Sequence, residues 1–336
     1  MSHYWIAAVA FLIGVMVTPS ALAAEPVRPL GPRSSGSTDA SQPAGPEESE
    51  TPEDSESGHG MPIVSLRSNY YGFADLDDPM PGTFEEDLEG AMLLTSFKGV
   101  VPIPFADRTI VLVPGLFFDH THLEYRNWDF GVTPAREQLD DFYATGLEMS
   151  VITELSERVW FVTRLTWGLY SDLKEVDATD ARLYGTLMAD VLVAENTVVG
   201  LGLSYNSDFG FPAPIPFAHF AYRNDWFRTD ITIPSDAQAY FLPHERVEIG
   251  VRARLLGNEY RMTYEDEDWN NMLVQLSTLE LGGIGAVRLF SGLWLELGAG
   301  AAVRNRYKAI LPNGEVLREI NFTPTWFANA ALIFRI

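Results

Sequence analysis

Charged residues that recur at alternate positions within apolar segments are the residues of this sequence best suited to chemistry. Alternate side chains of an extended chain point to the same face, so each segment would present one charged face and one apolar face. Where several charged faces enclose a common interior, charges of opposite sign can pair and bind small polar solutes. An Arg or Lys on a lipid-facing side would instead cost about 2–4 kcal/mol at the membrane midplane. The expected lumen-lining residues are Glu148, Arg164, Arg182, Asp190, Arg228, Asp230, Glu248, Arg252, Arg254, Glu280, Arg288, Glu296 and Arg304.

These charges admit two interpretations. They are either the polar lining of a pore that conducts or binds small solutes, or a salt-bridged, partly filled interior that only stabilises the wall. The sequence favours neither.

Two histidines lie two residues apart, at His120 and His122, with Asp119 and Glu124 nearby. On an extended segment both imidazoles would face the same way, which makes a surface metal site geometrically possible. The sequence offers no third ligand at a recognisable spacing. We therefore expect a solvated loop here and no metal site.

A membrane-embedded hydrolase would need a nucleophile or an activated water, a histidine and an acidic or amide partner. Of the remaining histidines in the strand-rich region, His219 and His244 lie in no Gly-x-Ser-x-Gly or metallo-hydrolase motif. A Gly-rich phosphate loop is also absent. We expect no enzymatic activity and no cofactor.

A long hairpin near the C-terminus shows which elements must position the charges. From Leu279 to Leu289, and again from Leu293 to Arg304, apolar residues alternate with charged or small ones, with a turn at Phe290-Ser291-Gly292 between them. Period two over this length indicates two long strands. Strands of about ten alternating residues, joined in turn by tight turns and longer loops, are typical of transmembrane β-barrels.

Similar segments fill the chain from residue 62 onward. The predicted fold class is all-β, a transmembrane antiparallel up-and-down barrel of about 14 strands. The number falls to 12 if the segment 237–242 and one neighbour do not span the membrane, and a large soluble β-sandwich or lipocalin-like barrel is the other alternative. The expected strands are 62–73, 88–100, 108–120, 142–154, 159–169, 182–193, 197–206, 218–222, 226–233, 237–242, 247–255, 279–289, 293–304 and 325–336.

The N-terminal 60 residues have a different composition. An apolar block from Trp5 to Val17, followed by Ala21-Leu22-Ala23-Ala24, predicts a signal peptide over residues 1–24, with a retained membrane anchor as the alternative. Residues 25–60 are rich in Pro, Ser, Glu and Asp and predict a disordered acidic linker, either merely solvated or a periplasmic spacer or docking tail. The barrel domain would span residues 61–336.

The whole-chain composition excludes several classes of protein. A formal net charge of −23 disfavours a nucleic-acid partner. The chain has no cysteine, which excludes disulfides, thiol nucleophiles and cysteine-based metal sites.

Two features place the barrel in a membrane. The amphipathic last strand resembles the signal that hands outer-membrane proteins to the barrel assembly machinery, although Ile336 stands where Phe or Trp is usual. It predicts the outer membrane of a Gram-negative-type bacterium, with lipid as a partner. Aromatic residues at expected strand ends fit interfacial girdles, with a stacking track for sugars as the alternative: Tyr70, Tyr71, Trp128, Tyr143, Trp226, Trp269 and Trp326.

The segment from Pro212 to Tyr260 resembles an uncharacterised family of exported outer-membrane β-barrel domains of unknown function. The resemblance is carried by Pro214-Ile215-Pro216, Trp226, Ile233-Pro234, Tyr240 and Gly257-Asn258-Glu259-Tyr260. It implies a fold and a location, and no activity.

The functional expectation is a passive or weakly selective channel for small hydrophilic solutes. The alternatives are a non-conducting structural or interaction barrel and, third, a membrane hydrolase that would depend on His219 or His244.

Overall fold

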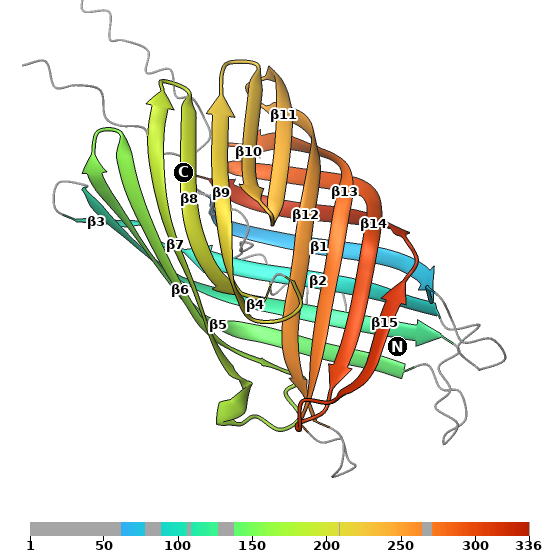
Figure 1. Ribbon diagram of the computed structural model, residues 1–336. Coiled ribbons are helices and arrows are strands. Elements are labelled where there is room, and N and C mark those ends of the chain that lie inside the picture. Colours follow the sequence, from blue (N-terminus) through green and yellow to red (C-terminus); the bar gives the residue numbers. More distant parts are fainter. Residues whose placement is uncertain are drawn as a thin grey trace, which may run out of the picture.

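The computed structural model describes residues 62–77, 89–105, 109–126, 138–207, 209–263 and 271–335, and it is built almost entirely of strands (Figure 1). The expected signal peptide and linker lie outside these residues. No helix in the described ranges is long and apolar enough to cross a membrane. The strands are β1 (Pro62–Asp75), β2 (Glu89–Val100), β3 (Ile103–Phe105), β4 (Ile110–Arg126), β5 (Gln138–Ser156), β6 (Val159–Ser171), β7 (Ala181–Ala194), β8 (Thr197–Asn206), β9 (Ala213–Arg223), β10 (Phe227–Ile233), β11 (Asp236–His244), β12 (Val247–Met262), β13 (Met272–Phe290), β14 (Leu293–Ile310), β15 (Val316–Phe322) and β16 (Thr325–Arg335).

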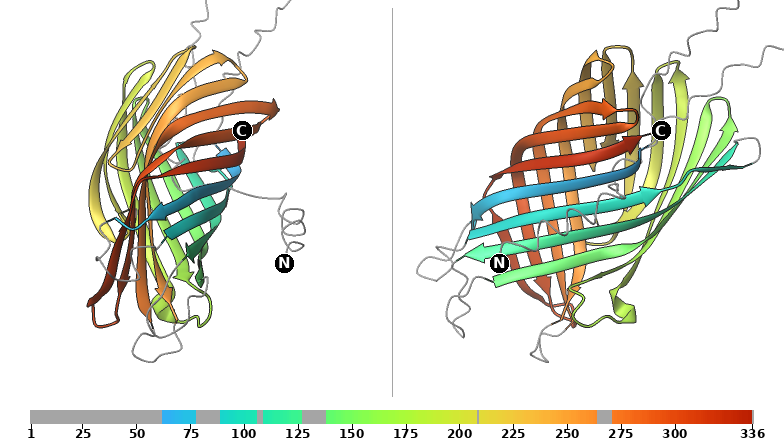
Figure 2. Two further views of the ribbon diagram at one scale, coloured as in Figure 1. Left: turned by 90° about the vertical axis from the view of Figure 1, so that its right-hand side faces the viewer. Right: turned by 180° about the vertical axis from the view of Figure 1, so that it is seen from behind.

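The strands close into an antiparallel barrel. Strands β4 to β14 each pair with their neighbours in sequence, and β2 pairs with β1 and β4. The ring is completed where β1 pairs with β16 and β14 pairs with both β13 and β16. Figure 2 shows this closure from behind, where blue β1 lies beside the red C-terminal strands.

Two of the sixteen strands continue others. β3 prolongs β2 along β4, and β15 and β16 follow each other along β14. If each continued strand is counted once, the barrel wall has fourteen strands, which confirms the predicted number.

Period-two alternation sorts side chains between the two faces of the wall. On β7, Leu183, Leu187 and Val191 are exposed, whereas Tyr184 and Met188 are buried. The same pattern on the other strands surrounds the barrel with exposed apolar side chains and leaves polar groups inside. This arrangement is the reverse of that in a soluble barrel.

Short turns gather at one end of the barrel and most longer connections at the other. Two-residue links join β5 to β6, β7 to β8, β11 to β12 and β13 to β14, and the last of these uses Gly292 at a φ of 77°. The register pairs Pro62 with Arg335, so both ends of the barrel domain lie at this short-turn end.

The barrel wall is shorter along the barrel axis at β10 and β11 than elsewhere. These strands have 7 and 9 residues, and only Pro234 and Ser235 connect them at the loop end. β10 pairs with β9 only from Ala218 onward, so one edge of β9 has no neighbouring strand at Pro214 and Pro216. Proline, which lacks an N–H donor, is tolerated there. This Pro-rich segment is not among the strands expected from the sequence, but β9 begins at Ala213.

We expect a charged side chain on the exposed apolar face to lower the stability of the barrel. Leu201 lies in the middle of β8 and is 69% exposed. In lipid vesicles, Leu201→Lys should lower the free energy of unfolding by about 2–4 kcal/mol if the residue lies at the bilayer midplane, because an ammonium group is costly in hydrocarbon. Urea unfolding of the refolded protein measures this change.

The matched control is Glu195→Lys, which places the same charge in the turn between β7 and β8. Glu195→Lys should change the free energy of unfolding only slightly. Equal stability of Leu201→Lys and wild type would show that this face meets water, as in a soluble barrel.

Candidate functional site

The barrel encloses a cavity of about 250 Å³. Its lining comes from opposite sides of the wall and includes charged and aromatic side chains together. These lining side chains include Lys98, Asp119, Glu148, Arg164, Tyr170 and Arg254.

An ion-pair cluster forms one wall of this cavity. Lys98 Nζ is paired with Glu148 Oε1, and Arg164 Nε lies 3.7 Å from the same oxygen. The side chains of Lys98 and Glu148 are 0% and 3% exposed, and Asp119 lies buried beside them. Two cations therefore face two carboxylates across β2, β4, β5 and β6. Lys98 was not among the expected lining residues. Its position two residues after Ser96, on the same face of β2, was the signal that could have identified it.

A second cluster, centred on arginines, lies on the opposite wall. Arg67 Nη2 is 2.5 Å from Glu296 Oε1, and Arg252 Nη2 is 2.7 Å from Asp236 Oδ2. Arg254 Nε lies 3.8 Å from Asp236 Oδ2. This cluster joins strands distant in sequence, because β1 and β14 are separated only by β16 in the closed ring.

Smaller networks hold other expected residues. Arg228 and Arg335 approach the two oxygens of Glu248 at 3.0 and 3.3 Å. Tyr71 donates a 2.6 Å hydrogen bond to Glu280. Tyr71 is thus buried inside the barrel, and the expectation that it belongs to an interfacial girdle is wrong.

The other girdle residues fall into two groups. Tyr70, Trp226 and Trp326 are exposed, at 37%, 59% and 56%, and Tyr143 is partly exposed. Trp128 and Trp269 lie outside the described residues.

His219 sits between two carboxylates. Its Nδ1 lies 2.9 Å from Asp190 Oδ1, and its Nε2 lies 3.7 Å from Asp230 Oδ1. Gly200 separates Asp190 from His219 in the register, and a Cβ at this glycine would collide with the Asp190 carboxylate. Both ring nitrogens face acids, whereas a serine-type hydrolase needs a hydroxyl at one of them.

Three expected residues lie away from the cavity. Arg182 approaches Glu259 at 3.4 Å at the loop end, and Arg288 pairs with exposed Glu245 at the short-turn end. Arg304 is exposed. A β-bulge in β14 shifts the parity between Ala302 and Arg304, so that Arg304 pairs with outward-facing Leu279. The expectation that Arg304 lines the lumen is therefore wrong.

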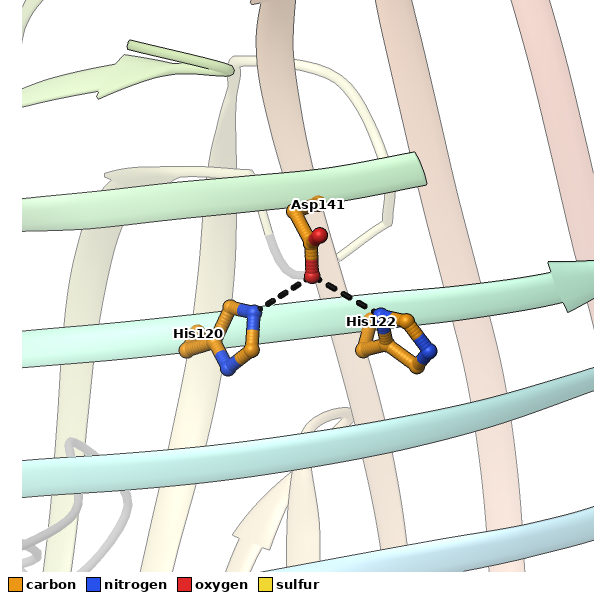
Figure 3. Close-up of side chains that lie close together, drawn as sticks. All are labelled: His120, His122 and Asp141. Carbon is orange, nitrogen blue, oxygen red and sulfur yellow. Dashed lines mark hydrogen bonds and ion pairs between the residues drawn. The ribbon is translucent and has the colours of Figure 1, made fainter. Parts of the chain in front are cut away.

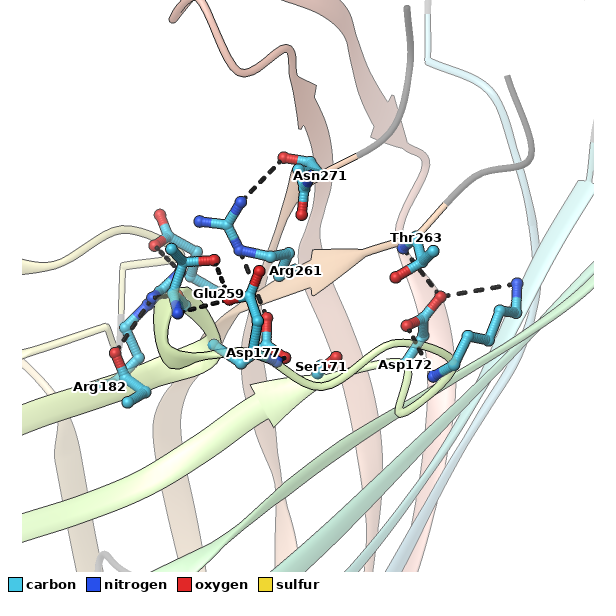
Figure 4. Close-up of polar contacts among 12 residues, drawn as sticks. Ser171, Asp172, Asp177, Arg182, Glu259, Arg261, Thr263 and Asn271 are labelled. Atoms are coloured by element: carbon cyan, nitrogen blue, oxygen red, sulfur yellow. Dashed lines mark hydrogen bonds and ion pairs between the residues drawn. The ribbon is translucent and has the colours of Figure 1, made fainter. Parts of the chain in front are cut away.

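A set of polar contacts, which we call the clasp, crosses the loop end of the barrel (Figure 4). The end of β6 meets β12 as a parallel pair at Ser171 and Arg261. The Asp172 backbone N–H donates to the Arg261 carbonyl at 3.1 Å, and the Thr263 N–H donates to the Asp172 carboxylate at 3.0 Å. Arg261 Nε also lies 3.4 Å from buried Asp180. The clasp joins opposite walls and narrows this end.

The connection that supplies the clasp is itself ordered by a capping box. Asp177 accepts hydrogen bonds from the backbone N–H and hydroxyl of Thr179, and its own N–H donates to Asp180. The hydrogen bonds from Thr179 lower the pKa of Asp177. This carboxylate therefore remains a charged cap for the 3-10 helix Ala178–Asp180 at neutral pH.

Apolar clusters occupy the lumen above and below the charges. Toward the loop end, Phe142, Tyr170 and Tyr260 belong to one cluster, in which Phe142 and Tyr260 stack with ring centroids 5.2 Å apart. Toward the short-turn end, Val113 and Ile152 belong to another. The charged layer is thus held between two apolar layers.

The comparison with protein families gives one match. The family model for a domain of unknown function, DUF6268, matches residues 117–309. The chain belongs to this family. The match covers the wall from β4 to β14, including the Pro212 to Tyr260 segment that carries the resemblance noted in the sequence.

No curated protein matches the sequence. Among solved structures, the Pseudomonas putida toluene transporter TodX is 9% identical, with a TM-score of 0.42 over 84% of this chain and 97% of that one. The COG4313 outer membrane channel from Pseudomonas putida F1 is 8% identical, with a TM-score of 0.41 over 82% and 97%. The β domain of the Bordetella autotransporter BrkA is 9% identical, with a TM-score of 0.31 over 81% and 98%.

We expect the stability of the ion-pair cluster around Lys98 to depend most on Glu148, the carboxylate that Lys98 and Arg164 share. Glu148→Gln leaves Lys98 and Arg164 facing each other without their common carboxylate and should lower the free energy of unfolding by about 3–5 kcal/mol. Lys98→Met should cost less, because Arg164 still neutralises Glu148. Urea unfolding of both variants tests this order, and a larger loss for Lys98→Met would contradict it.

Proposed function

We propose that this protein is an outer-membrane barrel of a Gram-negative-type bacterium that serves as a narrow channel for small hydrophilic solutes. The observation that carries the proposal is the internal cavity of about 250 Å³ bordered by Lys98, Glu148, Arg164 and Asp119. The exposed apolar face, the alternation of short turns with longer loops and the amphipathic last strand support the membrane location.

The charges around the cavity define the class of solute. Lys98, Arg164 and Arg254 lie around it together with Asp119, Glu148 and Asp236, so neither sign dominates. Such a lining can exchange its internal hydrogen bonds for bonds to a small polar or zwitterionic solute. The cavity volume of about 250 Å³ limits the channel to small solutes.

The solute reaches the cavity from the loop end, where the wall is lowest. Thr232, Ser235 and Asp236 at the β10–β11 turn line the cavity, and so do Asn206 and Asn258 on the flanking strands. The clasp narrows the same end from the side of β6. The clasp thereby limits the width of the solute pathway between the loop end and the cavity.

A non-conducting structural barrel is the second candidate. The observation that favours it is the pair of apolar clusters that occupies the lumen on either side of the charged layer. In that case the charges stabilise the wall, and interactions are made by the loops and by the acidic linker of residues 25–60. Deletion of this linker with no effect on any interaction would count against the linker's role.

We also propose that the function is not enzymatic. Both ring nitrogens of His219 face carboxylates. His244 lies exposed at the short-turn end and accepts a hydrogen bond from the Arg246 backbone N–H.

Single-channel conductance of the refolded protein in planar bilayers tests the channel. Wild type should show a small, steady conductance. The double variant Asp172→Ala, Arg261→Ala removes the carboxylate bond to Thr263 and the ion pair to Asp180, and it should raise the conductance at least twofold because only backbone contacts then hold the connection after β6 against β12.

The matched control is Glu245→Ala, Arg246→Ala, which removes two ion pairs at the short-turn end, one between these residues and one from Glu245 to Arg288. It should conduct like wild type. If all three proteins form heat-modifiable barrels on gels and none conducts, the channel is excluded and the structural barrel stands.

A further inference from the structure

Three potential metal ligands converge on the outer face of the barrel, away from the cavity (Figure 3). His120 and His122 lie on β4, and Asp141 lies on the neighbouring strand β5. From the sequence, a solvated loop is expected at the two histidines. β4 instead continues to Arg126, so both imidazoles share one face of a strand.

The third ligand comes from strand pairing. The register places Asp141 opposite His122 and Tyr143 opposite His120. Asp141 Oδ1 lies 2.7 Å from His120 Nε2 and 2.8 Å from His122 Nδ1. One ligand atom from each residue lies within 4.8 Å of the others.

The surroundings orient the ligands and leave them accessible. The His120 ring stacks on Tyr143, with ring centroids 4.9 Å apart and planes 13° from parallel. The side chains of His120, His122 and Asp141 are 21%, 29% and 44% exposed, so an ion can approach from solvent.

We propose that His120, His122 and Asp141 form a binding site for a borderline divalent transition-metal ion such as zinc. Imidazole nitrogens and one carboxylate suit zinc, copper and nickel, whereas calcium and magnesium require a shell of oxygens. Water completes the coordination on the exposed side, as at other sites with three protein ligands.

Side-chain rotation is needed to convert the hydrogen-bonded trio into a metal site. In a tetrahedral site with zinc–nitrogen and zinc–oxygen bonds of about 2.0–2.2 Å, neighbouring ligand atoms are roughly 3.3 Å apart. The two oxygen–nitrogen separations of 2.7 and 2.8 Å must therefore widen by about half an ångström, and the two histidine nitrogens, which lie within 4.8 Å of each other, must approach the same spacing. Partly exposed side chains can make such a change by rotation.

The bound ion would join β4 to β5 near their loop ends. The folded barrel brings the two strands together and the unfolded chain does not, so metal binding stabilises the folded state. A metal at this position acts on barrel stability and not on the cavity, which is lined by the opposite face of the same strands.

Isothermal titration of the refolded full-length protein in detergent with zinc chloride at pH 7.5 tests the site. One zinc ion should bind per chain, and the same addition should raise the melting temperature. His122→Ala and Asp141→Asn should each weaken binding at least tenfold. Lowering the pH to 5.5 should weaken it too, because protons compete for the imidazoles.

His244→Ala is the control, because it removes an exposed histidine at the opposite end of the barrel. It should bind zinc like wild type. Equal binding by all variants would assign the zinc to another part of the chain, such as the acidic segment 47–56, and would overturn the proposal. Absence of binding to wild type would also overturn it and leave the trio as a hydrogen-bonded cluster.

Discussion

The closure of the backbone hydrogen-bond ladder is the constraint on which the rest of this structure depends. β1 pairs with β16, and β14 pairs with β13 and β16, so the ring has no open edge over most of its height. In a hydrocarbon environment only such closure satisfies every strand. Once the ring is closed, period-two alternation must divide every strand between an outer and an inner face. The acidic and basic residues of neighbouring strands are then forced to face one another.

Pairing of these inner charges explains how so many ionised groups are accommodated. Glu148, Glu248 and Glu296 are each at most 4% exposed, and each is within ion-pair distance of two basic side chains. A carboxylate shared in this way links three strands. The clusters therefore join strands across the lumen, and one of them, formed by Lys98, Glu148 and Arg164, also lines the cavity.

The two ends of the barrel differ because their connections differ. Tight turns close one end, while the connection after β6 reaches across to β12 at the other. The clasp and the lowered wall at β10 and β11 both lie at the loop end. The histidine pair on the outer face of β4 is separate from the cavity, because the side chains that alternate with it, such as Asp119, point into the barrel.

The sequence by itself indicated the strands, their alternation and a number of about 14, because a period of two is a local property that survives whatever the strands pair with. It also indicated six of the twelve acidic and basic side chains that are buried in the described part of the chain, since their parity follows from the same pattern. Only the tertiary structure decided which charges meet. Glu296 and Arg67 are 229 residues apart in sequence, and no spacing rule connects them. The bulge that turns Arg304 outward and the register that brings Asp141 to His120 and His122 likewise depend on the pairing of neighbouring strands. A shift of one residue in either pairing would reverse the face on which these side chains lie.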